Sequence, residues 1–156
     1  MREKDYLAIL QKGSEILGEA IHVVDASGIT IIYNEAMAKL EKINVEDVLG
    51  KPFRDVFSYI PKNESTLTKA LSEGKETANK QQTYFNIYGK QITTINTTVP
   101  IEVNGEVVAA IEVAKDITDI KNMSDTILEL QKEAVEGADN DEAEAAKRRG
   151  KPKLKQ

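Results

Sequence analysis

The sequence predicts an α+β domain with two short strands, three short helical segments and a three-stranded antiparallel meander, flanked by a helix at each end. Runs rich in β-branched residues, bounded by turn-forming residues, predict the strands. Apolar residues at helical spacing predict the helices between and outside those runs. The 156 residues, 40% hydrophobic and 30% charged, are enough for one globular domain with a sizeable core.

The first elements are a helix and a hairpin. Residues 3–17 have apolar side chains at intervals of three or four, which is typical of an amphipathic helix. Gly18 suits the position just past the end of that helix. Residues 20–34 contain two β-rich runs on either side of Asp25-Ala-Ser-Gly28, a turn sequence, and therefore predict a β-hairpin.

Three helical segments and a meander follow. The helical patterns span residues 35–49, 53–60 and 64–74, and the last one ends at a glycine. The strands of the meander are predicted over residues 77–88, 91–102 and 106–116. Asn104-Gly105 between the last two is a strong hairpin signal.

The C-terminal part divides into a helix and a charged tail. Residues 117–136 predict a helix whose apolar residues follow the a/d spacing of a coiled coil for about two heptads. This stripe would either dimerise the chain or pack on its own domain; its residues are Ile120, Met123, Ile127, Leu130 and Ala134. Residues 137–156 have too few large apolar residues to fold alone, so a linker or disordered tail is expected there.

Composition excludes several kinds of chemistry. The chain has no cysteine, which excludes disulfides, thiolate metal sites and cysteine nucleophiles. Its single histidine, His22, excludes a three-histidine zinc site, and its place in a strand pattern argues against a catalytic triad. No segment approaches the ~20 apolar residues of a membrane span. We therefore expect a cytoplasmic protein that is not an enzyme and has no metal site.

Three motifs, in this order and at this spacing, resemble the PAS domain, a sensory fold of bacterial signalling proteins. They are "VVDASGITIIYN" in the first hairpin, "VLGKPFRDVF" after the helix that follows it, and Asp116-Ile117-Thr118 at the end of the last strand. The resemblance implies a PAS fold with a five-stranded antiparallel sheet and short helices on one face. It also implies the division into a flanking helix at 1–18, a PAS domain at 19–118, a signalling helix at 119–136 and the tail at 137–156.

A closer resemblance is to the N-terminal sensory domain of the sigma-54-dependent arginine-utilisation transcription regulators. It rests on "IHVVDASGITIIYN", "STLTKALSEGK" and "YFNIYGKQITTINTTVPI". In that family an ATPase domain and a helix-turn-helix DNA-binding domain follow the PAS domain. This chain has no G-x-x-x-x-G-K-[ST] phosphate-binding motif and no helix-turn-helix, so we expect a sensory fragment of such a regulator.

The resemblance also implies a ligand site on the inner face of the sheet. Glu112 would pair with the cationic group of a small polar metabolite such as arginine, ornithine or citrulline. Asp116 and Thr118 would relay binding to the C-terminal helix. A photoreactive flavin needs a cysteine and a haem usually needs a helical histidine, so neither cofactor is expected. The ligand-binding residues predicted in this way are His22, Tyr84, Thr94, Asn96, Thr98 and Glu112.

Other interpretations stay open at this point. His22 and Glu112 would satisfy each other as a structural ion pair without a ligand. Alternatively, Glu112 faces outward, into a dimer interface or under the first helix. A separate alternative to sensing is a ligand-free dimerisation or protein-interaction module, which the a/d stripe and the amphipathic first helix favour. The basic run at 147–155 would give nonspecific affinity for nucleic acid, although such runs are more often solvated linkers, and we expect no direct nucleic-acid binding.

Overall fold

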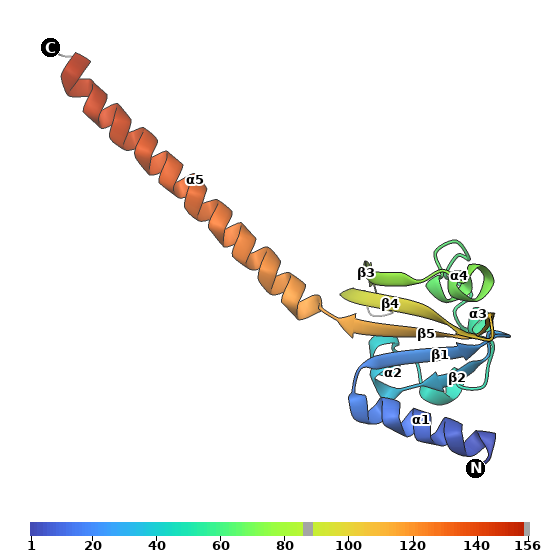
Figure 1. The fold of residues 1–156 in the computed structure, drawn as a ribbon. Coiled ribbons are helices and arrows are strands. Elements are labelled where there is room, and N and C mark those ends of the chain that lie inside the picture. Colours follow the sequence, from blue (N-terminus) through green and yellow to red (C-terminus); the bar gives the residue numbers. More distant parts are fainter. Residues whose placement is uncertain (86–88, 155–156) are drawn as a thin grey trace. The chain divides into compact units, whose positions relative to one another are not determined.

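The computed structural model describes residues 1–85 and 89–154, with the backbone alone for residue 84 and residues 139–154. One five-stranded antiparallel sheet has the strand order β2-β1-β5-β4-β3 (Figure 1). This confirms the predicted α+β class and sheet. The strands are β1 (Ala20–Asp25), β2 (Thr30–Tyr33), β3 (Thr77–Phe85), β4 (Gln91–Val103) and β5 (Glu106–Asp116).

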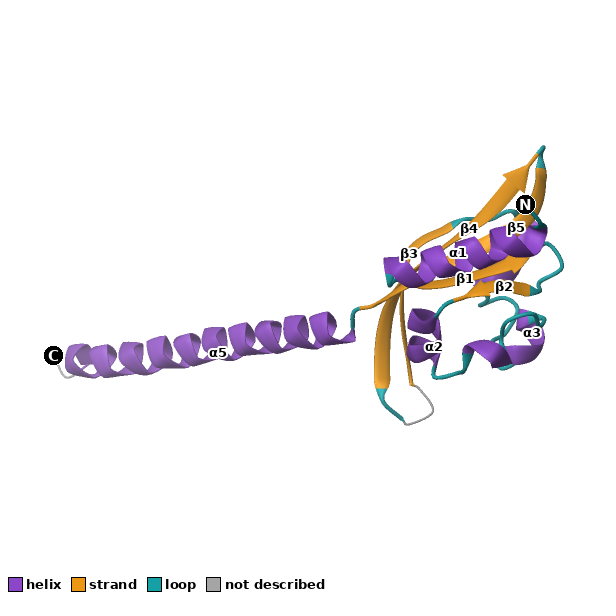
Figure 2. Ribbon diagram, turned by 90° about the horizontal axis from the view of Figure 1, so that it is seen from below, coloured by secondary structure: helices purple, strands orange, loops and turns teal. Residues whose placement is uncertain are grey.

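The first helix has its predicted bounds, whereas the helices between β2 and β3 are shorter than the sequence patterns predicted. The segment expected to be one helix over 35–49 is divided, because Lys42 has a left-handed backbone with φ of 58° and ends α2. Figure 2 shows α2 and α3 on the same side of the strands. The elements are α1 (Glu3–Leu17), α2 (Glu35–Glu41), a 3₁₀ turn (Val45–Asp47), α3 (Phe53–Val56) and α4 (Thr66–Glu73).

The first helix, α1, contacts the edge strand β2 through polar groups. The Gln11 amide donates to the Tyr33 carbonyl at 2.8 Å, and the Tyr33 N–H donates to the Gln11 side-chain oxygen at 3.2 Å. Gln11 therefore occupies edge groups of β2 that would otherwise be open to another strand. Most large apolar side chains of α1, including Ile9 and Leu10, are exposed.

The turn between β1 and β2 holds the start of α3. The Asp25 carboxylate accepts from the N–H groups of Ser27 and Ile29 at 2.9 and 3.0 Å, which stabilises the turn. The Phe53 N–H then donates to the Gly28 carbonyl at 2.9 Å. Because of this bond, the position of α3 depends on the hairpin turn.

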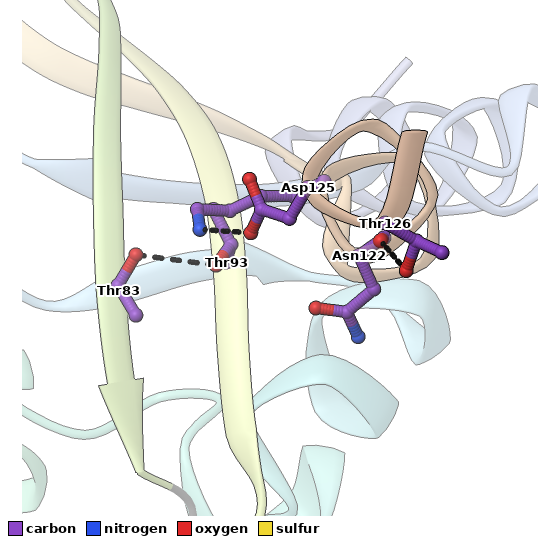
Figure 3. Close-up of polar contacts among 6 residues, drawn as sticks. Thr83, Thr93, Asn122, Asp125 and Thr126 are labelled. Atoms are coloured by element: carbon purple, nitrogen blue, oxygen red, sulfur yellow. Dashed lines mark hydrogen bonds and ion pairs between the residues drawn. The ribbon is translucent and has the colours of Figure 1, made fainter. Parts of the chain in front are cut away.

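The main hydrophobic core lies between the inner face of the sheet and the short helices. Val24 and Ala110 contribute from β1 and β5, and Met37, Phe53 and Leu67 contribute from α2, α3 and α4. α4 packs against β4 and β5. Adjacent strands are also joined by side chains, since the Thr83 and Thr93 hydroxyls of β3 and β4 are 3.1 Å apart (Figure 3).

The last helix, α5 (Thr118–Leu154), belongs to a second unit, Thr118–Gln156, which is separate from Met1–Ile117. It continues beyond residue 136, where the composition led us to expect a linker or disordered tail. Residues 137–149 are rich in alanine, glutamate, lysine and arginine, which have high helix propensity, and this accounts for the difference. Within α5, the Lys121–Asp125 ion pair at 2.9 Å and the Thr126 hydroxyl bond to the Asn122 carbonyl at 2.8 Å connect successive turns (Figure 3).

Candidate ligand cavity

A cavity of about 730 Å³ lies between the inner face of the sheet and the helices α2, α3 and α4. Its volume is within the range of small-molecule sites, and its wall combines aromatic rings with a few polar groups, as such sites usually do. The rings are those of Phe53, Phe57 and Tyr59. The chemically distinctive lining residues are His22, Glu41, Arg54, Thr94, Asn96 and Glu112.

Strand register brings most of the predicted site residues together. His22 of β1 and Thr98 of β4 both lie opposite Glu112 of β5, one on each side. Glu112 also lines the cavity, so it lies on the inner face and the outward alternative is wrong. Thr94 and Asn96 follow on the same face of β4, because side chains of a strand alternate.

Two of the predicted ligand-binding residues, Thr98 and Tyr84, are not placed in the cavity wall. Thr98 is fully buried beside the cavity, and its hydroxyl oxygen lies 2.8 Å from that of Thr66 on α4. It therefore ties α4 to the sheet and does not line the cavity. The backbone of Tyr84 pairs with Ile92 in β4, but its side chain lies outside the described part of the chain.

His22 is a neutral member of the wall. Its Nε2 lies 2.8 Å from the Thr30 hydroxyl, and its ring packs edge-on against Tyr33 at a centroid distance of 5.0 Å. Burial lowers the pKa of His22 to about 4, so the imidazole is uncharged at neutral pH. Among the described residues no ion pair joins it to Glu112, so the alternative of a structural pair between them is not supported.

Two of the carboxyl groups that line the cavity, Glu41 and Glu112, have raised pKa values. Burial raises the pKa of Glu112 to about 7. Burial, followed by the nearby Glu112 charge, raises the pKa of Glu41 to about 8, although a hydrogen bond from the Tyr33 hydroxyl at 2.5 Å opposes this rise. In the described part of the chain no basic group pairs with either carboxyl. These two carboxyl groups therefore have no ion-pair partner in the described part of the chain, although Arg54 lines the same cavity.

The β4 wall offers hydrogen-bonding groups that are not used internally. The Asn96 amide donates to the Gln82 side chain, while its oxygen is buried and has no partner in the part of the chain that the structure describes. The Thr94 hydroxyl is likewise buried without a partner among the described residues. Buried polar groups are normally paired, so unpaired ones on a cavity wall are available to a bound molecule.

Sequence reasoning missed Glu41, Tyr33 and Arg54. Glu41 is the last residue of α2, and Arg54 follows the first residue of α3. Nothing in the local pattern separates them from solvent-exposed charges on short helices. Their position in the cavity wall depends on how α2 and α3 pack against the sheet.

The predicted relay and dimerisation residues lie at the end of the sheet and in α5. Asp116 is the last residue of β5 and lies opposite Thr94, and Thr118 is the first residue of α5. Between them, the Ile117 N–H donates to the Thr93 carbonyl at 2.9 Å. The predicted dimerisation residues are exposed, namely Ile120 (61%), Met123 (65%), Ile127 (53%) and Leu130 (58%).

Comparison with known proteins identifies the family. A PAS domain family model matches residues 18–119, so the chain belongs to the PAS domain family. It is 40% identical over 124 residues to the transcriptional activator RocR of Bacillus subtilis (strain 168). The match covers 79% of this chain but only 27% of the relative, so this chain spans about a quarter of that protein's length. A regulatory domain is therefore indicated.

Solved structures show the same fold. An RNA-binding light-oxygen-voltage receptor matches with a TM-score of 0.59 at 20% identity, over 85% of this chain and 39% of that one. A PAS domain from Colwellia psychrerythraea matches with a TM-score of 0.54 at 22% identity, over 73% of this chain and 98% of that one. The PAS domain of Bordetella pertussis BvgS matches with a TM-score of 0.54 at 16% identity, over 81% of this chain and 98% of that one.

No helix in the described part of the chain has both the length and the apolar character that a bilayer crossing requires.

Proposed function

We propose that this PAS domain senses a small cationic amino acid and relays its binding from β5 into α5, without catalysing a reaction. The observation that carries the proposal is the pair of cavity carboxyl groups, Glu41 and Glu112, with no cationic partner among the described residues. A guanidinium or ammonium group between them would favour their ionised forms and supply the missing charge. Arginine and ornithine carry such a group.

The proposed relay uses the continuity of the chain. Glu112 lies in β5, and only Ile117 separates the end of this strand from Thr118, where α5 begins. A ligand that prefers one arrangement of β5 over another shifts the population of both arrangements. This change in the arrangement of β5 then reaches α5 through Asp116 and Thr118.

The resemblance to arginine-utilisation regulators and the identity to a transcriptional activator support a wider role. We propose that the longer protein carries an ATPase domain and a DNA-binding domain after this sensor, and that it works as a homodimer. The match to about a quarter of the relative's length is consistent with such further domains.

Thermal unfolding with added ligand tests the sensor proposal. A ligand that binds only the folded state raises the melting temperature with increasing concentration. We expect arginine or ornithine to raise it, and Glu112→Gln to lose at least about tenfold in affinity, because a charged hydrogen-bonded pair is replaced by a neutral one.

The matched control is Glu106→Gln, which makes the same change at an exposed position of the same strand. It should bind as the unsubstituted protein does. A flat response to all cationic amino acids, or an unchanged affinity in Glu112→Gln, would contradict the proposed role of Glu112.

A second candidate function is ligand-free dimerisation. The exposed apolar stripe of α5 favours it, because such side chains are normally covered in the working state. A protein that is dimeric in solution but shows no melting shift with any amino acid would support this function over sensing.

A further inference from the structure

The guanidinium group of Arg54, on the short helix α3, is only partly satisfied by the described part of the chain. Its Nε and Nη1 atoms are buried and have no hydrogen-bond partner among the described residues. A buried charge without a partner is strongly unfavourable, so such groups are rare unless something outside the chain binds them. Arg54 lines the same cavity as Glu41 and Glu112.

The cavity therefore carries unbalanced groups of both signs. No ion pair in the described part of the chain joins Arg54 to a carboxylate, although three glutamates, Glu41, Glu64 and Glu112, line the same space. A purely cationic ligand, such as a polyamine, would balance the acidic groups and leave Arg54 without a partner. A ligand with a carboxylate at one end and a cation at the other would satisfy both.

We propose that Arg54 binds the α-carboxylate of the ligand, so that the cavity selects a free amino acid over the corresponding decarboxylated amine. This inference rests on the proposed function above and specifies its ligand class. The planar guanidinium presents paired N–H donors that match the two oxygens of a carboxylate. The unpaired Asn96 oxygen and Thr94 hydroxyl are acceptors for the α-ammonium group.

The backbone next to Arg54 is held by the turn between β1 and β2. Phe53, the preceding residue, is buried, and its N–H is bonded to the Gly28 carbonyl of the hairpin turn. A side chain that is fixed at its base loses less conformational freedom on binding. Arg54 also borders a second depression that contains Lys62 and Lys69, so a control must separate the two spaces.

The experiment compares arginine with agmatine, which has the same guanidinium group but no carboxylate, by calorimetric titration of the full chain. We expect arginine to bind at least about tenfold more tightly than agmatine. Arg54→Met should weaken arginine binding by a similar factor and leave agmatine binding within about twofold, so that the preference disappears. Arg54→Lys, which keeps the charge, should retain part of the preference.

Lys62→Met is the matched control, because it removes a cation from the second depression only. It should keep the full preference for arginine. Loss of the preference in Lys62→Met would assign carboxylate recognition to the second depression and overturn the inference.

The outcomes separate this inference from the proposed function. Equal binding of arginine and agmatine by the unsubstituted protein would overturn the role of Arg54 and leave cation sensing standing. Equal weakening of both ligands by Arg54→Met would show a structural role and overturn it too. Binding of neither ligand would overturn the proposed function together with this inference. Because the readout is a ratio within each variant, a modest loss of stability does not imitate the expected result.

Discussion

At the scale of single residues, the cavity is defined by charges that the protein does not balance itself. His22 is neutral, since burial lowers its pKa to about 4 and its Nε2 is bonded to the Thr30 hydroxyl. It therefore provides no positive charge for Glu112. Burial instead raises the pKa of Glu112 to about 7 and that of Glu41 to about 8, so that both carboxyl groups titrate near neutral pH.

This arrangement predicts a pH-dependent affinity. A cation pairs with an ionised carboxylate, and the ionised fraction of Glu112 grows as pH rises through its pKa. Arginine affinity should therefore increase about tenfold between pH 6 and pH 8, with proton release on binding. Calorimetry in buffers of different ionisation enthalpy measures both quantities.

The other titratable groups of the cavity wall determine which control this prediction needs. His22 has lost its proton well below this range, so it does not produce the trend. Glu112→Gln should flatten most of the pH dependence and leave only the part due to Glu41. An affinity that falls as pH rises would contradict the acidic-site model.

At the scale of elements, the turn between β1 and β2 positions the α3 wall of the cavity. Gly28 is buried in this turn with φ of +81°, a left-handed conformation, and an added Cβ would meet the Phe53 ring at 3.3 Å. Two independent constraints thus require glycine here, and one of them involves the residue that precedes Arg54.

Gly28→Ala should destabilise the fold by about 2 kcal/mol, because the left-handed backbone and the close ring contact both disfavour a side chain. Chemical denaturation measures the loss. Gly13→Ala in α1 is the matched control, since nothing lies within 4 Å of the added methyl group. It should stabilise the protein by up to about 1 kcal/mol, because alanine favours the helix. An unchanged free energy of unfolding in Gly28→Ala would show that the turn adapts and would contradict this prediction.

At the scale of the whole molecule, the sensor unit and α5 have different kinds of surface. The unit Met1–Ile117 has its own core, whereas the described part of α5 exposes apolar side chains at a/d spacing. The a/d side chains of such a helix normally pack against a second helix in a coiled coil. We therefore expect the homodimer to form through this stripe.

Ile127→Glu should shift the dimer toward monomer by at least about tenfold in dissociation constant, because a charge replaces an apolar contact in the seam. Sedimentation equilibrium measures the shift. Lys132→Gln changes net charge by the same amount on the opposite side of the a/d stripe, and should leave the dimer unchanged. A protein that is monomeric at all concentrations would contradict a seam along this stripe.

The sequence by itself determined the strands, the hairpin turn and the polar character of the inner sheet face. These depend on short-range rules: alternation along a strand, turn chemistry at Asp25–Gly28 and helix spacing. The alternation of side chains along β4 therefore identified Thr94 and Asn96 as cavity residues, once the strand order of the family was assumed.

Only the tertiary structure decided which groups surround Glu112. Glu41 and Arg54 reach the cavity because α2 and α3 pack against β1 and the hairpin turn, and His22 is bonded to Thr30 because the β1–β2 hairpin brings the two together. These contacts result from competition among side chains of different elements for one enclosed space. No local pattern encodes that competition, since it depends on which elements pack together and on how much water they exclude.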